Sequence, residues 1–364
     1  MSKKQKYYRL DKILKENATY NILLGSRSTG KSYAVKEKAL QDAINGRGEF
    51  ALLRRYAMDV TPSKVVRYFG DMPIEAMTNC NYNEVFARGG SIFLRKYNYE
   101  SQQLDKSIPP LLVGHYCALA QAEHIKSDAS FENVITVIYE EFITNALYIK
   151  DEPNELLQLI STISRRRQVQ VFLIGNTISR LSPYFQDWQL NNVPRQKQDS
   201  IDNYFIETDD EPIKISVEFC GNTDYKNKMF FGASKKAIVN GAWETNDEPR
   251  LTNKKREYNI LYRIFLCDMG FSFAIELLQH YKNNNQMCIF VYPCKPKKEN
   301  ARILSTDYNE NWNVSPFLNM NNQAEFWIGK CYEFGKVAYS DNLTASDFKS
   351  ILLNNTKLFQ GANW

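Results

Sequence analysis

The chain has 364 residues, 43% of them hydrophobic, which is enough for two domains with full cores. The 46 Lys and Arg exceed the 41 Asp and Glu, and the net charge of +5 permits a nucleic-acid partner without demanding one. The sequence contains neither a run of about 18 apolar residues nor an apolar segment after its basic start, which excludes a membrane-spanning protein. The seven Cys form no C-x-x-C pair and the three His lack metal-ligand spacing, so we expect reduced thiols that fill the core.

Residues 1–18 are polar but carry Tyr7, Tyr8 and three aliphatic side chains at helical spacing. The pattern predicts a short amphipathic helix, and the favoured interpretation is that it docks against a sheet. The alternative is that one of its aromatic rings stacks on the ring of a bound ligand.

The first motif that carries chemistry is Gly25-Ser26-Arg27-Ser28-Thr29-Gly30-Lys31-Ser32, which fits the phosphate-binding loop pattern G-x-x-x-x-G-K-[ST]. It follows an apolar run at 20–24 and precedes a helical pattern over 33–44, the context that the motif requires. Its glycines let backbone amides surround phosphate oxygens at a helix N-terminus. We predict a nucleotide site in which Lys31 binds the β- and γ-phosphates and the Ser32 hydroxyl binds Mg²⁺. The alternative is a glycine-rich turn before a helix.

Three further segments predict strands before the middle of the chain. Residues 50–56 read as a buried strand, and its Arg54 and Arg55 would lie at the ligand-binding edge of the sheet or extend into solvent. Residues 83–97 alternate around two glycines and predict a β-hairpin. Residues 114–122 predict a further strand.

The second decisive stretch is an apolar, β-branched strand at 134–141 that ends in Glu140 and Glu141. This is the form of a Walker B segment, in which the first acid holds Mg²⁺ and the second polarises the attacking water. Most such proteins have Asp at the metal-side position, but the longer Glu140 would still reach Mg²⁺ directly or through a water. The alternative is a solvated pair of acids, which the preceding phosphate-binding loop disfavours.

Residues 154–164 predict a helix that ends in three arginines, Arg165, Arg166 and Arg167. Cations at this end suit the helix dipole, and the alternative is an arginine finger at a subunit edge. Residues 169–176 predict a strand whose tip, Asn176, would lie beside the γ-phosphate. The strand–helix–strand order predicts a parallel, doubly wound α/β sheet.

The character of the sequence changes after Pro194. Charge clusters, glycines, prolines and short candidate strands such as 213–219 predict a lid or linker segment. Later strands near 258–268, 271–277 and 287–292 predict a small mixed domain. We therefore divide the chain into a P-loop ATPase domain at 1–195, a lid or linker at 196–250 and a C-terminal α+β domain at 251–364.

With the strand before the phosphate-binding loop and the Walker B strand both assigned, the sequence resembles the DNA-packaging ATPases of small tailed phages with protein-primed genomes. These are the packaging ATPases of the phi-twenty-nine type. The resemblance covers roughly 20–190 and rests on residues 24–34, 53–56, 133–143, 175–176 and 182–185. It implies an α/β P-loop ATPase of the additional-strand, catalytic-glutamate class with a mainly parallel sheet. It also implies a smaller C-terminal domain that looks like a vestigial RNase H-type nuclease.

The family's functional residues transfer to matching positions of this sequence. The resemblance implies that Gly25 to Ser32 bind ATP, that Ser32 and Glu140 hold Mg²⁺ and that Glu141 is the catalytic glutamate. It assigns Asn176 as the sensor, Arg165 or Arg166 (with Arg167 one position away) as a trans-acting arginine, and Lys126, if one residue is inserted, as a DNA-binding pore lysine. A basic residue such as Arg27 is also common in the loop of this family.

The resemblance further implies a motor that drives double-stranded DNA through the portal into the prohead. Its partners would be DNA, the portal and further copies of the chain in a pentameric ring, in the host cytoplasm on the prohead. Whether a packaging RNA takes part is not decided by the sequence. The alternatives are a terminase large subunit with an active nuclease and another DNA-dependent P-loop ATPase of the helicase type.

Asp268 follows a strand and precedes a glycine, as the first metal ligand of an RNase H-type nuclease does. The downstream acids Asp307, Asp341 and Asp347 follow no clear apolar strand, so we expect solvated surface acids. We therefore predict that the C-terminal domain does not cut DNA. The cationic residues at 254–256 and 295–298 instead predict a surface that holds nucleic acid or the portal.

Overall fold

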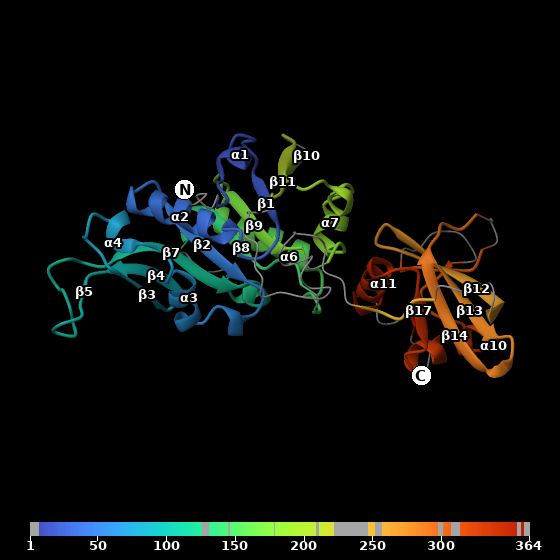
Figure 1. Cartoon of the computed structure of the whole chain (residues 1–364). Helices are drawn as coiled ribbons and strands as arrows, with labels where there is room; N and C mark the ends of the chain where they lie inside the picture. Colours follow the sequence, from blue (N-terminus) through green and yellow to red (C-terminus); the bar gives the residue numbers. More distant parts are fainter. Residues whose placement is uncertain are drawn as a thin grey trace, which may run out of the picture.

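The computed structural model describes residues 7–125, 131–144, 146–177, 179–208, 211–221, 247–251, 257–297, 301–306, 314–354 and 358–359. Figure 1 shows two lobes, each built around one large β-sheet. The N-terminal lobe carries the strands labelled β1 to β11, and the C-terminal lobe carries β12 to β17. The helix labels of the N-terminal lobe run from α1 to α7, and α10 and α11 belong to the C-terminal lobe.

The sheet of the N-terminal lobe has nine strands, and its six central strands are parallel to one another. The remaining three strands, at the two edges, are antiparallel. The predicted mainly parallel sheet is thereby confirmed, as is the hairpin at 83–97. In spatial order the strands are β10 (Ser200–Ile206), β11 (Ile213–Phe219), β1 (Tyr20–Gly25), β9 (Gln170–Asn176), β8 (Val134–Glu140), β2 (Glu49–Arg54), β7 (Leu111–Ala118), β4 (Ser91–Arg95) and β3 (Glu84–Arg88).

Helices cover both faces of this sheet, which explains why its central strands are continuously apolar. Successive residues of β1 point to opposite faces. Ile22 and Leu24 pack in a core that includes α6 and α7, whereas Leu23 packs in a core that includes α2. The helices of the lobe are α1 (Asp11–Leu14), α2 (Lys31–Ile44), α3 (Pro62–Tyr68), α4 (Ile74–Met77), α5 (Ala122–Ile125), α6 (Glu152–Ser164) and α7 (Pro183–Asp187). A small two-stranded ribbon of β5 (Tyr97–Asn98) and β6 (Gln103–Leu104) projects from the N-terminal lobe (Figure 1).

Both ends of the predicted lid or linker, 196–250, contact the lobes on either side of it. β10 and β11 lie inside this range, yet they complete the first sheet, because β11 pairs in parallel with β1 over residues 20–24. Polar and apolar side chains alternate along β11, and the polar Ser216 and Glu218 are buried. At the other end, residues 247–251 contact the second lobe, where Pro249 accepts a backbone hydrogen bond from Tyr339. The intervening residues 222–246 lie outside the described residues.

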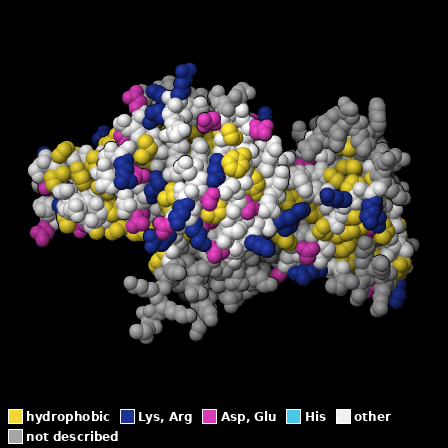
Figure 2. Space-filling model, turned by 90° about the horizontal axis from the view of Figure 1, so that it is seen from above, with side chains coloured by type: hydrophobic (Ala, Val, Ile, Leu, Met, Phe, Trp, Pro, Cys, Tyr) yellow, Lys and Arg dark blue, Asp and Glu magenta, His cyan; other side chains and the backbone are white. Residues whose placement is uncertain are grey.

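The sheet of the C-terminal lobe has six strands, in which a three-stranded antiparallel meander is extended by parallel strands on both sides. Two helices, α10 (Gln323–Glu333) and α11 (Asn342–Asn354), contribute to its core. In spatial order the strands are β16 (Val314–Ser315), β15 (Ile303–Leu304), β12 (Tyr258–Asp268), β13 (Phe271–His280), β14 (Asn283–Pro293) and β17 (Val337–Tyr339). Figure 2 shows hydrophobic side chains gathered on one face of this lobe.

The two lobes meet where the segment after β9 reaches α11. Arg180 forms an ion pair with the buried Asp347, and the Ser179 hydroxyl lies 3.4 Å from the Ser350 hydroxyl. Leu181 is buried in the core of the C-terminal lobe. The expectation that Asp347 is a solvated surface acid is therefore wrong, because α11 places its side chain against the other lobe. In the described part of the chain, no helix is both long and apolar enough to span a bilayer.

Candidate functional site

The phosphate-binding loop connects the end of β1 to the start of α2, as predicted. Its backbone turns through the left-handed region at Gly25, Ser28 and Gly30, where φ is 152°, 60° and 96°. A Cβ at Gly25 would lie only 3.2 Å from the Cβ of Cys220 on the neighbouring chain segment, so both the turn and the packing favour glycine there. The loop ends at the N-terminus of the 14-residue helix α2, whose free amides and dipole attract anions.

Lys31 lies across this loop, and its side chain is buried. Its ammonium group donates to the carbonyl oxygen of Ser26 at 2.6 Å and to the hydroxyl of Thr29 at 3.3 Å. Burial lowers the pKa of Lys31, while the nearby Cys220 and Glu140 raise it. A phosphate beside this ammonium group would supply the negative charge that the loop's neutral oxygens lack.

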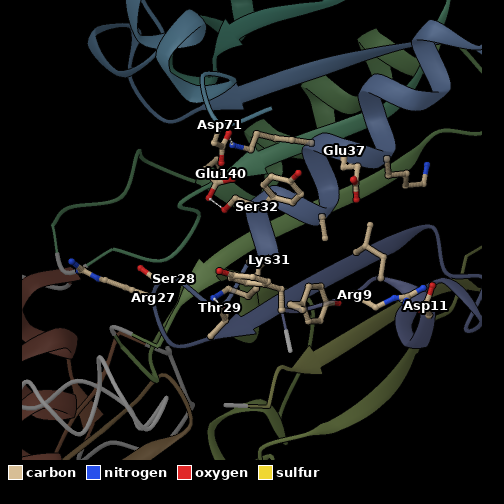
Figure 3. Close-up of a pocket in the computed structure, with 18 of the residues that line it drawn as sticks. Arg9, Asp11, Arg27, Ser28, Thr29, Lys31, Ser32, Glu37, Asp71 and Glu140 are labelled. Atoms are coloured by element: carbon tan, nitrogen blue, oxygen red, sulfur yellow. Dashed lines mark hydrogen bonds and ion pairs between the residues drawn. The ribbon is translucent and has the colours of Figure 1, made fainter. Parts of the chain in front are cut away.

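The Ser32 hydroxyl and the Glu140 carboxylate meet at the base of the same cavity (Figure 3). The hydroxyl donates to Oε1 of Glu140 at 2.7 Å, although the two residues are 108 positions apart. Tyr68 donates to the second oxygen, Oε2, also at 2.7 Å. Burial raises the pKa of Glu140, and the hydrogen bonds from Tyr68 and Ser32 oppose that rise. The longer glutamate thus reaches the serine that was predicted as its fellow metal ligand.

Glu141 differs from Glu140 in being exposed and in having a left-handed backbone, with φ of 60°. Its carboxylate pairs with Arg54 at 2.6 Å, so the arginine at the end of β2 does reach the ligand-binding edge. Arg55 donates to the backbone carbonyl of Glu141 at 3.2 Å and pairs at 2.8 Å with Glu152, which is fully buried. The non-glycine turn at Glu141 is therefore held by a buried ion pair, and its side chain is left facing the cavity.

Asn176 ends β9 directly beside the loop, because β9 pairs with β1 in a register that sets Asn176 opposite Gly25. The next residue, Thr177, donates its amide to the Gly25 carbonyl at 3.3 Å. Asn176, Glu140 and Glu141 all line the cavity that contains Lys31. The structure therefore brings together the predicted loop, both acids and the predicted sensor.

The N-terminal segment closes one side of this cavity, which has a volume of about 1190 Å³. The amide of Tyr8 donates to the Thr29 carbonyl at 3.0 Å, and its hydroxyl donates to Glu218 at 2.7 Å. Burial is the main reason that the pKa of the Tyr8 phenol is raised. Tyr7 also lines the cavity, and its side chain is exposed. The N-terminal segment therefore docks on the loop and on β11 through Tyr8, as the favoured interpretation predicted.

The arginines after α6 lie away from this cavity, at the edge where β8 begins. Arg165 is 4.0 Å from Glu132, just before that strand, and Arg165 and Arg166 are both exposed. Arg167 donates to the carbonyl oxygens of Phe131 and Val134 and so joins the helix end to the strand. Arg165 and Arg166 therefore do not reach the phosphate-binding loop of their own chain.

Lys126 lies outside the described residues, as do 254–256, Lys298 and Asp307. The contact of Lys126 with DNA therefore stays a prediction. The same holds for a nucleic-acid or portal surface at 254–256 and 295–298.

The residues present fit a nucleotide with its magnesium ion. The loop amides, the helix N-terminus and Lys31 form a cradle of positive potential at one end of the cavity. Ser32 and Glu140 contribute a hydroxyl and a carboxylate oxygen, the hard ligands that Mg²⁺ prefers. The chemistry of the donor set therefore suits Mg²⁺ rather than a metal that needs nitrogen or sulfur ligands.

A family model described as podovirus DNA encapsidation protein (Gp16) matches residues 1–232, more than half of the 364 residues. The chain belongs to this family. Over 326 residues it is 29% identical to the DNA packaging protein of Bacillus phage phi29, a match that covers 85% of this chain and 86% of that protein. The DNA packaging protein of Bacillus phage PZA is 26% identical over 324 residues, with the same coverage.

A solved structure described as the bacteriophage Phi-29 viral genome packaging motor assembly shares the fold of this DNA encapsidation family member. Its TM-score is 0.54 at 20% identity, and the match covers 95% of this chain and 98% of that chain. The resemblance stated from the phosphate-binding loop and the acid pair is therefore confirmed at the level of the family.

In the C-terminal lobe of this encapsidation family member, Asp268 is buried at the end of β12 and accepts hydrogen bonds from the amide and hydroxyl of Thr306, at 2.8 Å and 2.7 Å. Asp341 accepts from the amide of Thr344 at 2.8 Å, near the start of α11. Among the described residues, no group of three or more His, Cys, Asp or Glu side chains is arranged to hold a metal ion. Asp268 joins β12 to the segment at Thr306, whereas Asp341 accepts hydrogen bonds from the first turn of α11.

Proposed function

We propose that this chain hydrolyses ATP, with Mg²⁺, and uses the free energy to move double-stranded DNA through a portal into a preformed capsid. The observation that carries the proposal is the contact between Ser32 and Glu140 beside an acid that faces the same cavity. Membership of the DNA encapsidation family supports DNA as the substrate that is moved. The packaging proteins of phages phi29 and PZA support the same assignment.

The proposed mechanism assigns one task to each side chain at the cavity. The loop amides and Lys31 bind the phosphates, and Ser32 and Glu140 hold Mg²⁺, which neutralises charge on the phosphate oxygens when bound. Glu141 orients and polarises the attacking water after its carboxylate leaves Arg54. Asn176 senses the γ-phosphate from the end of β9.

The strand order supports the proposed class of P-loop ATPase. β9 lies between the loop strand β1 and the acid-bearing strand β8, and we propose that it is the additional strand of the catalytic-glutamate class. For the C-terminal lobe we propose an RNase H-type ancestry, supported by a meander, β12 to β14, followed by β15 and β16 in parallel with β12. We propose a first domain that ends after β11, a connection through 222–246 and a second domain that begins by residue 247.

We further propose that the chain works as a pentameric ring on the portal of the prohead, in the cytoplasm of the infected cell. The position of Arg165 and Arg166 supports a ring, because both are exposed and lie at the sheet edge opposite their own phosphate-binding loop. An arginine in that place acts on a neighbouring subunit or on none. Such a residue stabilises charge on the γ-phosphate and is worth roughly 10³- to 10⁵-fold in rate.

Steady-state ATP hydrolysis, measured with and without double-stranded DNA, tests the proposed activity directly. We expect Mg²⁺-dependent turnover that DNA stimulates, and DNA entry into purified proheads that requires ATP. ATP hydrolysis that unwinds a forked duplex instead would favour the helicase alternative. Absence of ATP binding would overturn the proposal.

Mixing two inactive variants tests the trans arginine. Arg165→Ala subunits retain the phosphate-binding loop, whereas Lys31→Ala subunits retain the arginine, so a mixed ring should recover part of the lost turnover. The same experiment with Arg166→Ala identifies which of the two side chains acts. If no mixing ratio restores turnover, the arginines serve only as cations at the C-terminal end of α6, where they suit the helix dipole.

A further inference from the structure

Both oxygens of the Glu140 carboxylate are held by hydroxyl groups from separate elements. Ser32 of α2 donates to Oε1 and Tyr68 of α3 donates to Oε2, each at 2.7 Å. Figure 3 shows Glu140 pointing toward Ser32 at the base of the cavity. Oε1 lies beside Ser32, the other predicted metal ligand. Tyr68 holds Oε2, the oxygen that is not in contact with Ser32.

Tyr68 is itself fixed by neighbours on two sides. The ammonium group of Lys36 donates to the Tyr68 carbonyl at 2.7 Å and lies 4.7 Å from the centre of its ring. Next to it, the ring of Phe69 packs edge-on at 5.0 Å, and Phe69 is buried in the core against Phe50. The hydroxyl of Tyr68 is therefore aimed by a rigid frame.

The P-loop helix supplies two parts of this arrangement from one face. Ser32 and Lys36 are one turn apart on α2, so both point toward α3. Lys36 also forms an ion pair with Asp71, which anchors the segment after α3 to the same helix. The loop, α3 and the end of β8 thus form one connected unit around Glu140.

Glutamate at this position needs such support more than aspartate would. Its side chain has one more rotatable bond, and fixing that bond costs conformational entropy. A partner that orients a ligating carboxylate typically changes metal affinity or activity by about 10- to 100-fold. The Tyr68 hydroxyl meets the geometric requirement of such a partner.

We propose that Tyr68 is a positioning residue for Glu140: its hydroxyl holds one carboxylate oxygen so that the other is presented to the Mg²⁺ that accompanies ATP. This inference rests on the proposed nucleotide site and names a residue that determines its dependence on the metal. A hydroxyl that merely filled the hydrogen-bonding capacity of a buried acid would stabilise the fold without changing that dependence.

The test is the affinity for the non-hydrolysable ATP analogue AMP-PNP, measured by calorimetry on the full chain with Mg²⁺ and with EDTA. In Tyr68→Phe we expect the affinity in EDTA to be unchanged and the gain produced by Mg²⁺ to fall by about tenfold or more. The control is Tyr82→Phe, whose hydroxyl donates at 3.3 Å to the Pro109 carbonyl at the surface and should change neither value.

Lys36→Met is a second variant, in case Tyr68→Phe does not fold. It removes the cation that holds the ring and carbonyl of Tyr68. It should also reduce the increase in AMP-PNP affinity that Mg²⁺ produces, but by less than Tyr68→Phe does. Equal weakening with Mg²⁺ and with EDTA, or an unchanged gain from Mg²⁺, would overturn the assignment of Tyr68. Failure of the unaltered protein to bind AMP-PNP under either condition would instead overturn the nucleotide site.

Discussion

The buried ionisable side chains at the cavity of the first lobe differ from those inside the second lobe. In the first lobe, Lys31 and Glu140 line a cavity and are held mainly by hydroxyl and carbonyl groups. In the second, Asp268, Glu276 and Glu325 are joined to fixed partners: Thr306 for the first, Arg263 and Tyr292 for the second, Arg302 for the third. A buried acid at or near a strand end therefore indicates chemistry only where it faces a cavity together with a cation and a second polar group.

The largest expected effect is on the cation of the first lobe. Lys31→Ala should abolish ATP binding in a filter or calorimetric assay, because the phosphates lose their main counter-charge. The matched control in the second lobe is Lys330→Ala, which removes a half-buried lysine on α10 that pairs with Glu333. Tight ATP binding by Lys31→Ala would break the contrast between the lobes.

The next effect is on hydrolysis alone. Glu141→Gln should bind ATP normally but turn it over about 10²- to 10⁴-fold more slowly, because a neutral amide does not activate water. Single-turnover phosphate release measures the chemical step, and Glu333→Gln is the control. Near-normal turnover in Glu141→Gln would transfer the catalytic role to Glu140.

In the second lobe we expect an acid to affect stability and not chemistry. Glu325→Ala leaves Arg302 without the carboxylate that it contacts at 3.0 Å, and Glu325 is buried. Denaturant unfolding should show a loss of about 3 kcal/mol in this lobe, with ATP affinity unchanged. Glu333→Ala removes an exposed pair and should cost less than about 1 kcal/mol. Equal costs would mean that burial does not distinguish the two acids.

A smaller effect is expected at the contact between the lobes. Asp347→Asn removes the charge that pairs with Arg180, which lies four residues after Asn176, so it weakens the link between the proposed nucleotide site and α11. Basal ATP hydrolysis should be unchanged, while its stimulation by DNA should fall about threefold or more, as expected for a coupling of about 1 kcal/mol. Exchanging the charges, with Arg180→Asp and Asp347→Arg together, should recover part of the stimulation. Unchanged stimulation in Asp347→Asn would show that the contact carries no coupling.

We expect no effect at all on DNA cleavage, which the second lobe should not catalyse. The full chain incubated with supercoiled plasmid and Mn²⁺ should leave the DNA intact, and Asp268→Asn should behave identically, because Asp268 serves to join β12 to Thr306. Plasmid nicking by the unaltered protein that disappears in Asp268→Asn would make the chain a nuclease-bearing terminase.

The sequence predicted the parts of the site that depend on local pattern. The phosphate-binding loop, β8 and Asn176 could be placed because parallel strands bring their carboxyl ends to one edge of a sheet. The contribution of Tyr68 could not be predicted from the sequence, because Tyr68 lies 72 positions from Glu140 and its role depends on how α3 packs. No periodic signal marks such a contact.

The same limit applies to the second lobe and to the link between the lobes. No helix is predicted from the sequence after Asp341, although the Asp341 carboxylate accepts the amide of Thr344 in the first turn of α11. The ion pair of Arg180 with Asp347 spans 167 positions. A local pattern contains no information about which distant surface will cover an acid.

The contact between Tyr8 and Thr29 has a practical consequence for handling the protein. A label attached at Tyr7 would lie at the mouth of the cavity, because Tyr7 lines the cavity and Tyr8 is hydrogen bonded to the loop. Helix α10 belongs to the other lobe, away from the loop (Figure 1). A fluorophore is therefore best attached on α10, where it leaves the cavity open.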